Sequence, residues 1–138
     1  MEDQRHPHVL LIDDDSINNY VTEHVIRSGF SKAKIKSFTK PQAGLDYIHT
    51  QYSLPGSHKT VLLLDINMPV LSGWDVLKIF KDYPDTIKAQ FEIYMFTSSI
   101  SYEDKQKAND NPLVSGLIEK PLSATHLENI FKTLLIKL

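Results

Sequence analysis

Cysteine is absent from the 138 residues, so the chain can form no disulfide, thiolate metal site or thiol nucleophile. An excess of basic residues is also missing, because 15 Lys and Arg stand against 17 Asp and Glu, for a formal charge of -2. The polar, acid-containing amino terminus predicts no signal peptide, and no apolar run is long enough to span a membrane. We therefore expect a cytoplasmic protein that binds neither nucleic acid nor membranes directly.

The composition is that of an ordinary globular protein, with 41% hydrophobic and 23% charged residues, 5 Gly and 7 Pro. No internal repeat, low-complexity tract or charge block marks a linker. We predict one domain over residues 1–138, with its core at about residues 9–138.

Short runs of Val, Ile and Leu alternate along the chain with stretches whose apolar residues recur at helical spacing. That alternation predicts an α/β fold with five strand and helix pairs. The expected architecture is a five-stranded, doubly wound parallel sheet in the order 2-1-3-4-5, as in flavodoxin-like (βα)5 folds, with helices on both faces. The predicted strands are residues 9–12, 33–38, 60–66, 91–96 and 114–118.

Two of the helices have a clear apolar stripe in the sequence. We expect the first helix to turn one face toward the core, formed by Ile17, Tyr20, Val21, His24 and Val25. We expect the same of the last helix, whose stripe is Leu127, Ile130, Phe131, Leu134, Leu135 and Leu138.

Polar residues follow the apolar strands, at the edge where parallel sheets bind ligands. They are Asp13, Asp14 and Asp15 after the first strand, Asp65 and Asn67 after the third, Thr97, Ser98 and Ser99 after the fourth, and Lys120 after the fifth. Packing does not explain such a cluster at one edge, and we interpret it as a site.

Carboxylates brought this close repel one another unless a cation lies between them. Oxygen ligands without His or Cys favour Mg²⁺, with Asp13 and Asp14 as ligands. Asp65, at the end of the central strand, is the expected nucleophile toward phosphorus. The metal and Lys120 can neutralise the phosphoryl charge, and a threonine hydroxyl can donate to another phosphoryl oxygen. Asp15 is expected to cap the following helix.

Four motifs lie at these strand ends, and they are VLLIDDDS, VLLLDINMPVLSGWDVL, YMFTSS and GLIEKPL. In this order and spacing they resemble the receiver domain of two-component response regulators, in particular the single-domain chemotaxis regulators. The resemblance covers about residues 9–138. It implies a phosphoprotein of phosphorelay signal transduction without an attached output domain.

The resemblance also implies a Mg²⁺ site. Asp14 and Asp65 would bind the metal directly, Asp13 partly through water, and Asn67 through its backbone carbonyl. No other cofactor is implied.

By the same resemblance, Asp65 accepts a phosphoryl group from a sensor histidine kinase or a histidine phosphotransfer protein. Lys120 pairs with that group, and Thr97 moves inward to hydrogen-bond it. The implied protein is a phosphoacceptor rather than an enzyme, limited to Mg²⁺-dependent self-phosphorylation and slow self-dephosphorylation. The bond between Lys120 and Pro121 is expected to be cis.

Output is expected through contact with a downstream protein, at the surface of the helix at residues 102–109, the strand at 114–118 and the last helix. A homodimer is left open. Leu117 stands three residues before the lysine, where many family members have a switching Tyr or Phe. The switch is therefore expected to use the loop after Thr97, or Phe96.

Three alternatives use the same fold. An aspartyl-phosphate phosphohydrolase would need a general acid two residues after Asp65, where this chain has Asn67, and a cap domain. A pseudo-receiver would not need the full acid set. A flavin-binding protein would need a hydroxyl and glycine-rich phosphate loop after the first strand, which is acidic here.

Overall fold

A computed structural model describes residues 6–56 and 58–136, with the backbone alone for residues 133–136. The chain alternates strands and helices in the order β1, α1, β2, α2, β3, α3, α4, β4, α5, β5 and α6. Among the described helices, none has the length and apolar character needed to cross a membrane.

The five strands form one sheet in the order β2-β1-β3-β4-β5, and all four pairings are parallel. The predicted fold class and strand order are therefore confirmed. Each strand also begins and ends within one residue of its predicted bounds. The strands are β1 at His8–Ile12, β2 at Lys34–Phe38, β3 at Thr60–Asp65, β4 at Phe91–Thr97 and β5 at Val114–Glu119.

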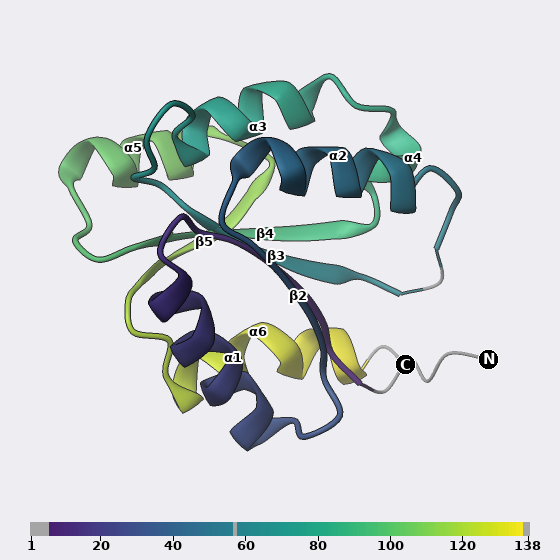
Figure 1. Cartoon of the computed structure of the whole chain (residues 1–138), viewed down its shortest axis with the longest axis vertical. Coiled ribbons are helices and arrows are strands. Elements are labelled where there is room, and N and C mark those ends of the chain that lie inside the picture. Colours follow the sequence, from purple (N-terminus) through teal and green to yellow (C-terminus); the bar gives the residue numbers. More distant parts are fainter. Residues whose placement is uncertain (1–5, 57, 137–138) are drawn as a thin grey trace.

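Helices cover both faces of the sheet (Figure 1), with α1 and α6 on one face and α2, α3, α4 and α5 on the other. Their bounds are Ser16–Gly29 for α1, Pro41–Gln51 for α2, Gly73–Lys81 for α3, Asp85–Lys88 for α4, Tyr102–Asp110 for α5 and Ala124–Ile136 for α6. The sequence predicts no helix at α4, because four residues are too few to show a helical period. Buried Ile87 anchors this short helix to the core.

The central strand β3 explains how one sheet supports two apolar layers. Leu62 and Leu64 point into the layer under α2 and α3, whereas Val61 and Leu63 point into the layer under α1 and α6. Because both faces are covered, β3 is buried along its whole length. This double burial is why parallel strands of this kind are apolar at nearly every position.

The face of α1 that packs on the sheet matches the predicted one only at Val25, which packs against the layer shared with α6. Ile17 and Tyr20 are 74% and 73% exposed, and His24 is also exposed. The buried residues of α1 are Asn19, Thr22 and Ile26, which recur at the spacing of three and four residues of a helix face. The apolar stripe misled the prediction because the start of α1 lies over a polar region, where Asn19 hydrogen-bonds the backbone of β1's end.

The last helix follows the prediction as far as its side chains are described. Leu127, Ile130 and Phe131 are buried in the layer shared with α1. The side chains of Leu134 and Leu135, and the whole of Leu138, lie outside the described residues.

The first residue of helix α3, Gly73, packs directly against the backbone at the end of β3. The Gly73 amide donates to the Ile66 carbonyl at 2.9 Å. A Cβ at position 73 would lie 2.5 Å from the Asp65 carbonyl oxygen and 3.0 Å from the Ile66 Cα. Only glycine allows this close approach, so the helix start is fixed against Asp65.

We expect Gly73→Ala to lower the free energy of unfolding by about 1–3 kcal/mol, because the clashing atoms belong to the backbone and cannot turn aside. Urea unfolding followed by circular dichroism measures the change. Gly29→Ala is the matched control, since its Cβ would meet Leu127 Cδ1 at an ordinary 3.5 Å. The control should shift stability by less than about 0.5 kcal/mol. Equal losses in the two variants would contradict the proposed clash.

Candidate phosphoacceptor and metal site

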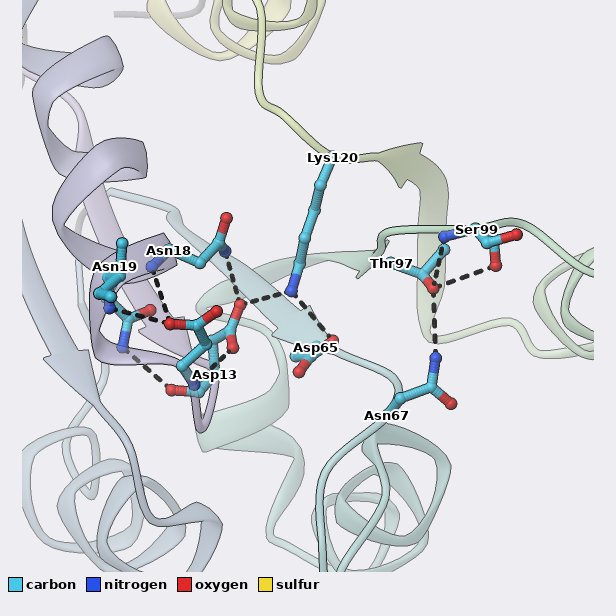
Figure 2. A network of polar contacts seen from close by, with 10 residues as sticks. Asp13, Asn18, Asn19, Asp65, Asn67, Thr97, Ser99 and Lys120 are labelled. Carbon is cyan, nitrogen blue, oxygen red and sulfur yellow. Dashed lines mark hydrogen bonds and ion pairs between the residues drawn. The ribbon is translucent and has the colours of Figure 1, made fainter.

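Asp13 and Asp65 come together because β1 and β3 are neighbours in parallel register. Ile12 pairs with Leu64, so the next residue of each strand lies at the same edge of the sheet. Asp13 is 2% exposed and Asp65 is 4% exposed. Two carboxylates are therefore held almost out of water, side by side, as Figure 2 shows.

Asp13 accepts hydrogen bonds on both carboxylate oxygens. The Asp15 amide donates to Oδ1 at 2.9 Å. The Asn18 amide side chain donates to Oδ2 at 2.6 Å, and the Lys120 ammonium donates to the same atom at 2.7 Å. These three donors fix the position of the buried carboxylate.

Lys120 is the cation shared by the two acids. Its Nζ lies 2.7 Å from Asp13 Oδ2 and 3.3 Å from Asp65 Oδ1, and its side chain is only 15% exposed. The backbone of Lys120 is fixed as well, because its amide donates to the Thr97 carbonyl at 2.7 Å. The bond from Lys120 to Pro121 is cis, as expected.

The surroundings at this edge raise the pKa of both Asp65 and Lys120. Burial, followed by the charge of Asp13, raises the pKa of Asp65 from 3.8 to about 7, against the opposing effect of Lys120. Burial lowers the pKa of Lys120, but hydrogen bonds and charges from Asp13 and Asp65 outweigh it and raise that pKa overall. One ammonium is therefore too little to keep Asp65 fully ionised at neutral pH.

Asp14 completes the acidic group from the solvent side. One carboxylate oxygen from each of Asp13, Asp14 and Asp65 lies within 4.8 Å of the other two, and Asp14 is exposed. Three carboxylates face one ammonium, so the group has an excess of negative charge. An all-oxygen set of this kind fits a hard divalent cation, and the residues present could hold one.

Thr97 lies at the end of β4, and its hydroxyl is turned toward its own loop. Thr97 is completely buried. Its Oγ1 donates to the Ser99 carbonyl at 3.2 Å and accepts from the Asn67 amide side chain at 3.4 Å (Figure 2). Ser98, next to it, is exposed. The hydroxyl is thus held by long hydrogen bonds to Asn67 and to the loop that follows β4.

The loop that follows Asp65 contains a strained residue. Val70 has a φ of 70° and is 99% exposed. The Leu71 amide donates to the Pro69 carbonyl at 2.8 Å, which closes a three-residue turn around Val70. A β-branched residue disfavours this left-handed conformation, so packing at both ends of the loop fixes its path.

Two asparagines of α1 support the site and were not predicted from the sequence. Asn18 donates to the Asp13 carboxylate, and Asn19 donates to the Asp13 carbonyl at 3.0 Å. The available signal was their position, since both amides lie in the first turn of the helix that follows the acid cluster. Asp15 caps α1 as predicted, accepting from the amides of Ile17 and Asn18.

Leu117 and Phe96 lie on opposite sides of the sheet. Leu117, on β5, is half-buried and packs against the layer under α2 and α3. Phe96, on β4, is buried in the layer under α1 and α6, and the Lys120 amine lies 5.3 Å from its ring centre. Leu117 therefore stands on the side of the sheet that carries α5.

Solved structures with the same fold include several response regulators. A two component response regulator from Cytophaga hutchinsonii is 30% identical, with a TM-score of 0.85 over 95% of this chain and 98% of that one. A two-component response regulator from Legionella pneumophila is 25% identical, with a TM-score of 0.76 over 93% of this chain and 97% of that one. A response regulator receiver protein from Dyadobacter fermentans is 23% identical, with a TM-score of 0.82 over 91% of this chain and 95% of that one, which shows the shared fold alone.

Two sequence comparisons were informative in different ways. A search among curated proteins finds no match to this chain. The family model of the response regulator receiver domain matches residues 9–132, which include every residue of the acidic edge. The chain therefore belongs to the response regulator receiver domains, the phosphoacceptor signalling modules of two-component systems.

Proposed function

We propose that this chain accepts a phosphoryl group on Asp65 from a phosphohistidine, with Mg²⁺ held by the neighbouring acids. The donor is a sensor histidine kinase or a histidine phosphotransfer protein. The observation that carries the proposal is the Lys120 ammonium between Asp13 and Asp65, at 2.7 and 3.3 Å. It leaves a nucleophilic carboxylate beside a cation and beside two further acids.

Mg²⁺ would be held directly by Asp14 and Asp65, with the backbone carbonyl of Asn67 as a further ligand. Asp13 contributes partly through water, which agrees with both of its oxygens already accepting hydrogen bonds. When bound, the metal neutralises charge on the transferring phosphoryl oxygens. It also favours the ionised form of Asp65, which the buried carboxylate otherwise resists.

In the transfer, a carboxylate oxygen of Asp65 forms the new bond to phosphorus as the phosphorus–nitrogen bond of the phosphohistidine breaks. The electron pair stays on the imidazole nitrogen of the donor. Lys120, already within 3.3 Å of Asp65, then faces a phosphoryl oxygen, and the Thr97 hydroxyl can donate to another.

We propose that Thr97 passes the signal onward. Its hydroxyl must give up the bond to the Ser99 carbonyl before it can donate to a phosphoryl oxygen. Ser99 lies two residues before Ser101, whose side chain caps α5 by accepting from the Asp104 amide at 3.0 Å. Movement of this loop therefore changes the position of α5.

The readout surface in this proposal is the face of α5, β5 and α6, where a downstream protein would bind. Leu117 on β5 stands where many family members have an aromatic switch, so the loop after Thr97 carries the change without a ring that swings inward. Receiver domains as a class interact with kinases and with downstream effectors. A homodimer, a cytoplasmic location and a single domain over residues 1–138 stay predictions from the sequence.

A phosphohydrolase is disfavoured by the residue two positions after Asp65. The side-chain amide of Asn67 donates a hydrogen bond to Thr97 Oγ1, but it has no acidic proton that it could transfer to a leaving group. A carboxylic acid is the usual general acid at such a position. We therefore propose no turnover beyond Mg²⁺-dependent self-phosphorylation and slow loss of the same phosphoryl group.

Phosphorylation is tested by intact-mass analysis after incubation with acetyl phosphate and Mg²⁺. We expect one labile phosphoryl adduct in the wild-type protein. The adduct should be absent in Asp65→Asn and in the presence of a chelator. Asp15→Asn is the matched control, because this acid of the same triplet caps α1 and an asparagine caps equally well. An adduct that persists in Asp65→Asn would remove Asp65 from the role.

The raised pKa of Asp65 predicts a pH dependence of stability. Between about pH 4 and 7 the folded protein binds a proton that the unfolded chain has released, so the free energy of unfolding falls as the pH rises through this range. In chelator we expect a loss on the order of 2 kcal/mol between pH 5 and 8 that is absent in Asp65→Asn. Added Mg²⁺ should stabilise the wild type more at pH 8 than at pH 5.

Urea unfolding at several pH values measures both effects. All other ionisable side chains are the same in the two proteins, so the difference between wild type and Asp65→Asn isolates Asp65. The same slope in the two proteins would contradict the raised pKa, and equal stabilisation by Mg²⁺ at both pH values would contradict binding to the ionised acid.

A further inference from the structure

A groove of about 700 Å³ lies between α3, α4 and the end of α5. The helices that line it lie on the side of the sheet that carries α2 to α5 (Figure 1). Its apolar floor is formed by Trp74 and Leu77 of α3 and by Leu113, which follows α5. The groove contains none of Asp13, Asp65 or Lys120, so it is separate from the proposed phosphorylation site.

The rim of the groove is basic, although the whole chain has a formal charge of -2. Four lysines line it, against two aspartates, and the lysines are Lys78, Lys81, Lys88 and Lys107. Lys88 is already engaged, since its Nζ lies 3.3 Å from Asp85 Oδ1 and donates to the Lys81 carbonyl at 2.8 Å. Within residues 6–56 and 58–132, the other three amines form no ion pair.

One of the two aspartates, Asp75, caps the start of its own helix, α3. The Asp75 carboxylate accepts from the Ser72 amide at 3.0 Å, in a capping box at the start of α3. The hydrogen bonds from Ser72, with smaller contributions from Lys78 and Lys107, hold the pKa of Asp75 below its usual value. A hydrogen bond does not remove the negative charge of Asp75, but the four lysines of the lining outnumber its two aspartates, so the groove has a net positive formal charge around an apolar floor.

The polar groups of the groove leave little to recognise a nucleotide base. The Trp74 indole donates to Asp104 Oδ1 at 3.2 Å, and the Lys107 amine lies 5.8 Å from the indole ring centre. The side chains of Ser72 and Asn111 accept hydrogen bonds from nearby backbone amides. The remaining features are lysine amines and apolar surface.

We propose that this groove binds an acidic peptide segment of a partner protein. An apolar side chain of the segment lies on Trp74, Leu77 and Leu113. Its carboxylates face the amines of Lys78, Lys81 and Lys107. Charge complementarity steers the segment to the groove, and burial of the apolar side chain holds it there. This surface differs from the face of α5, β5 and α6 proposed for output, and binding here does not depend on phosphorylation.

The test uses the full chain and a fluorescein-labelled synthetic peptide of glutamates with two leucines in its centre. Fluorescence anisotropy at low salt measures Kd, and the fluorescence of Trp74, the 1 tryptophan of the chain, reports whether the peptide reaches the groove. We expect saturable binding that weakens with added salt. Replacing the leucines by serines should weaken binding, and replacing the glutamates by lysines should abolish it.

Two charge-matched double variants separate the groove from general attraction. Lys78→Gln/Lys107→Gln should raise Kd by about tenfold. Lys32→Gln/Lys105→Gln removes the same charge from exposed positions outside the groove and should change Kd by less than about twofold. Thermal unfolding confirms that both variants fold.

Three outcomes would overturn the proposal. No saturable binding at low salt would mean that the groove does not take an acidic segment. Equal loss in the two double variants would mean attraction without a site. ATP that displaces the peptide and changes Trp74 fluorescence at a lower concentration would make the groove a nucleotide site instead. Because none of these measurements uses a phosphodonor, they leave the proposed function of Asp65 untouched.

Discussion

The Lys120 ammonium between two buried carboxylates is the interaction on which the site depends. Asp13 and Asp65 are both nearly inaccessible to water, and two such charges at this distance repel each other strongly. Lys120 neutralises part of that repulsion, at 2.7 Å from Asp13 and 3.3 Å from Asp65. The balance is incomplete, because burial and Asp13 still raise the pKa of Asp65. That remaining excess of negative charge makes the edge receptive to a second cation.

The sheet topology makes this arrangement possible for residues that are far apart in the chain. Lys120 is separated from Asp13 by 107 positions and from Asp65 by 55. Parallel strands place all their carboxyl ends at one edge, and the order β2-β1-β3-β4-β5 sets β1 beside β3 there. Apolar layers on both faces hold the strands in register. The two layers therefore determine the geometry of the polar edge.

The strands and the polar edge could be predicted because both leave local signals. Strand β3 is apolar throughout until Asp65, and Lys120 precedes a proline at a strand end. The packing of α1 could not be predicted in the same way. Its apolar residues Ile17 and Tyr20 face solvent, whereas Asn19 is buried because it satisfies a carbonyl of the site. Hydrophobic periodicity carries no information about such a bond.

Competition between Lys120 and a metal ion is the most direct consequence of shared charge at this edge. Isothermal titration calorimetry can compare the Mg²⁺ affinity of the wild type with that of Lys120→Met, which keeps an unbranched side chain of similar length and removes its charge. We predict that the variant binds Mg²⁺ about tenfold more tightly, because the carboxylates lose their internal cation. Unchanged or weaker Mg²⁺ binding in a folded Lys120→Met protein would contradict the central role of this charge balance.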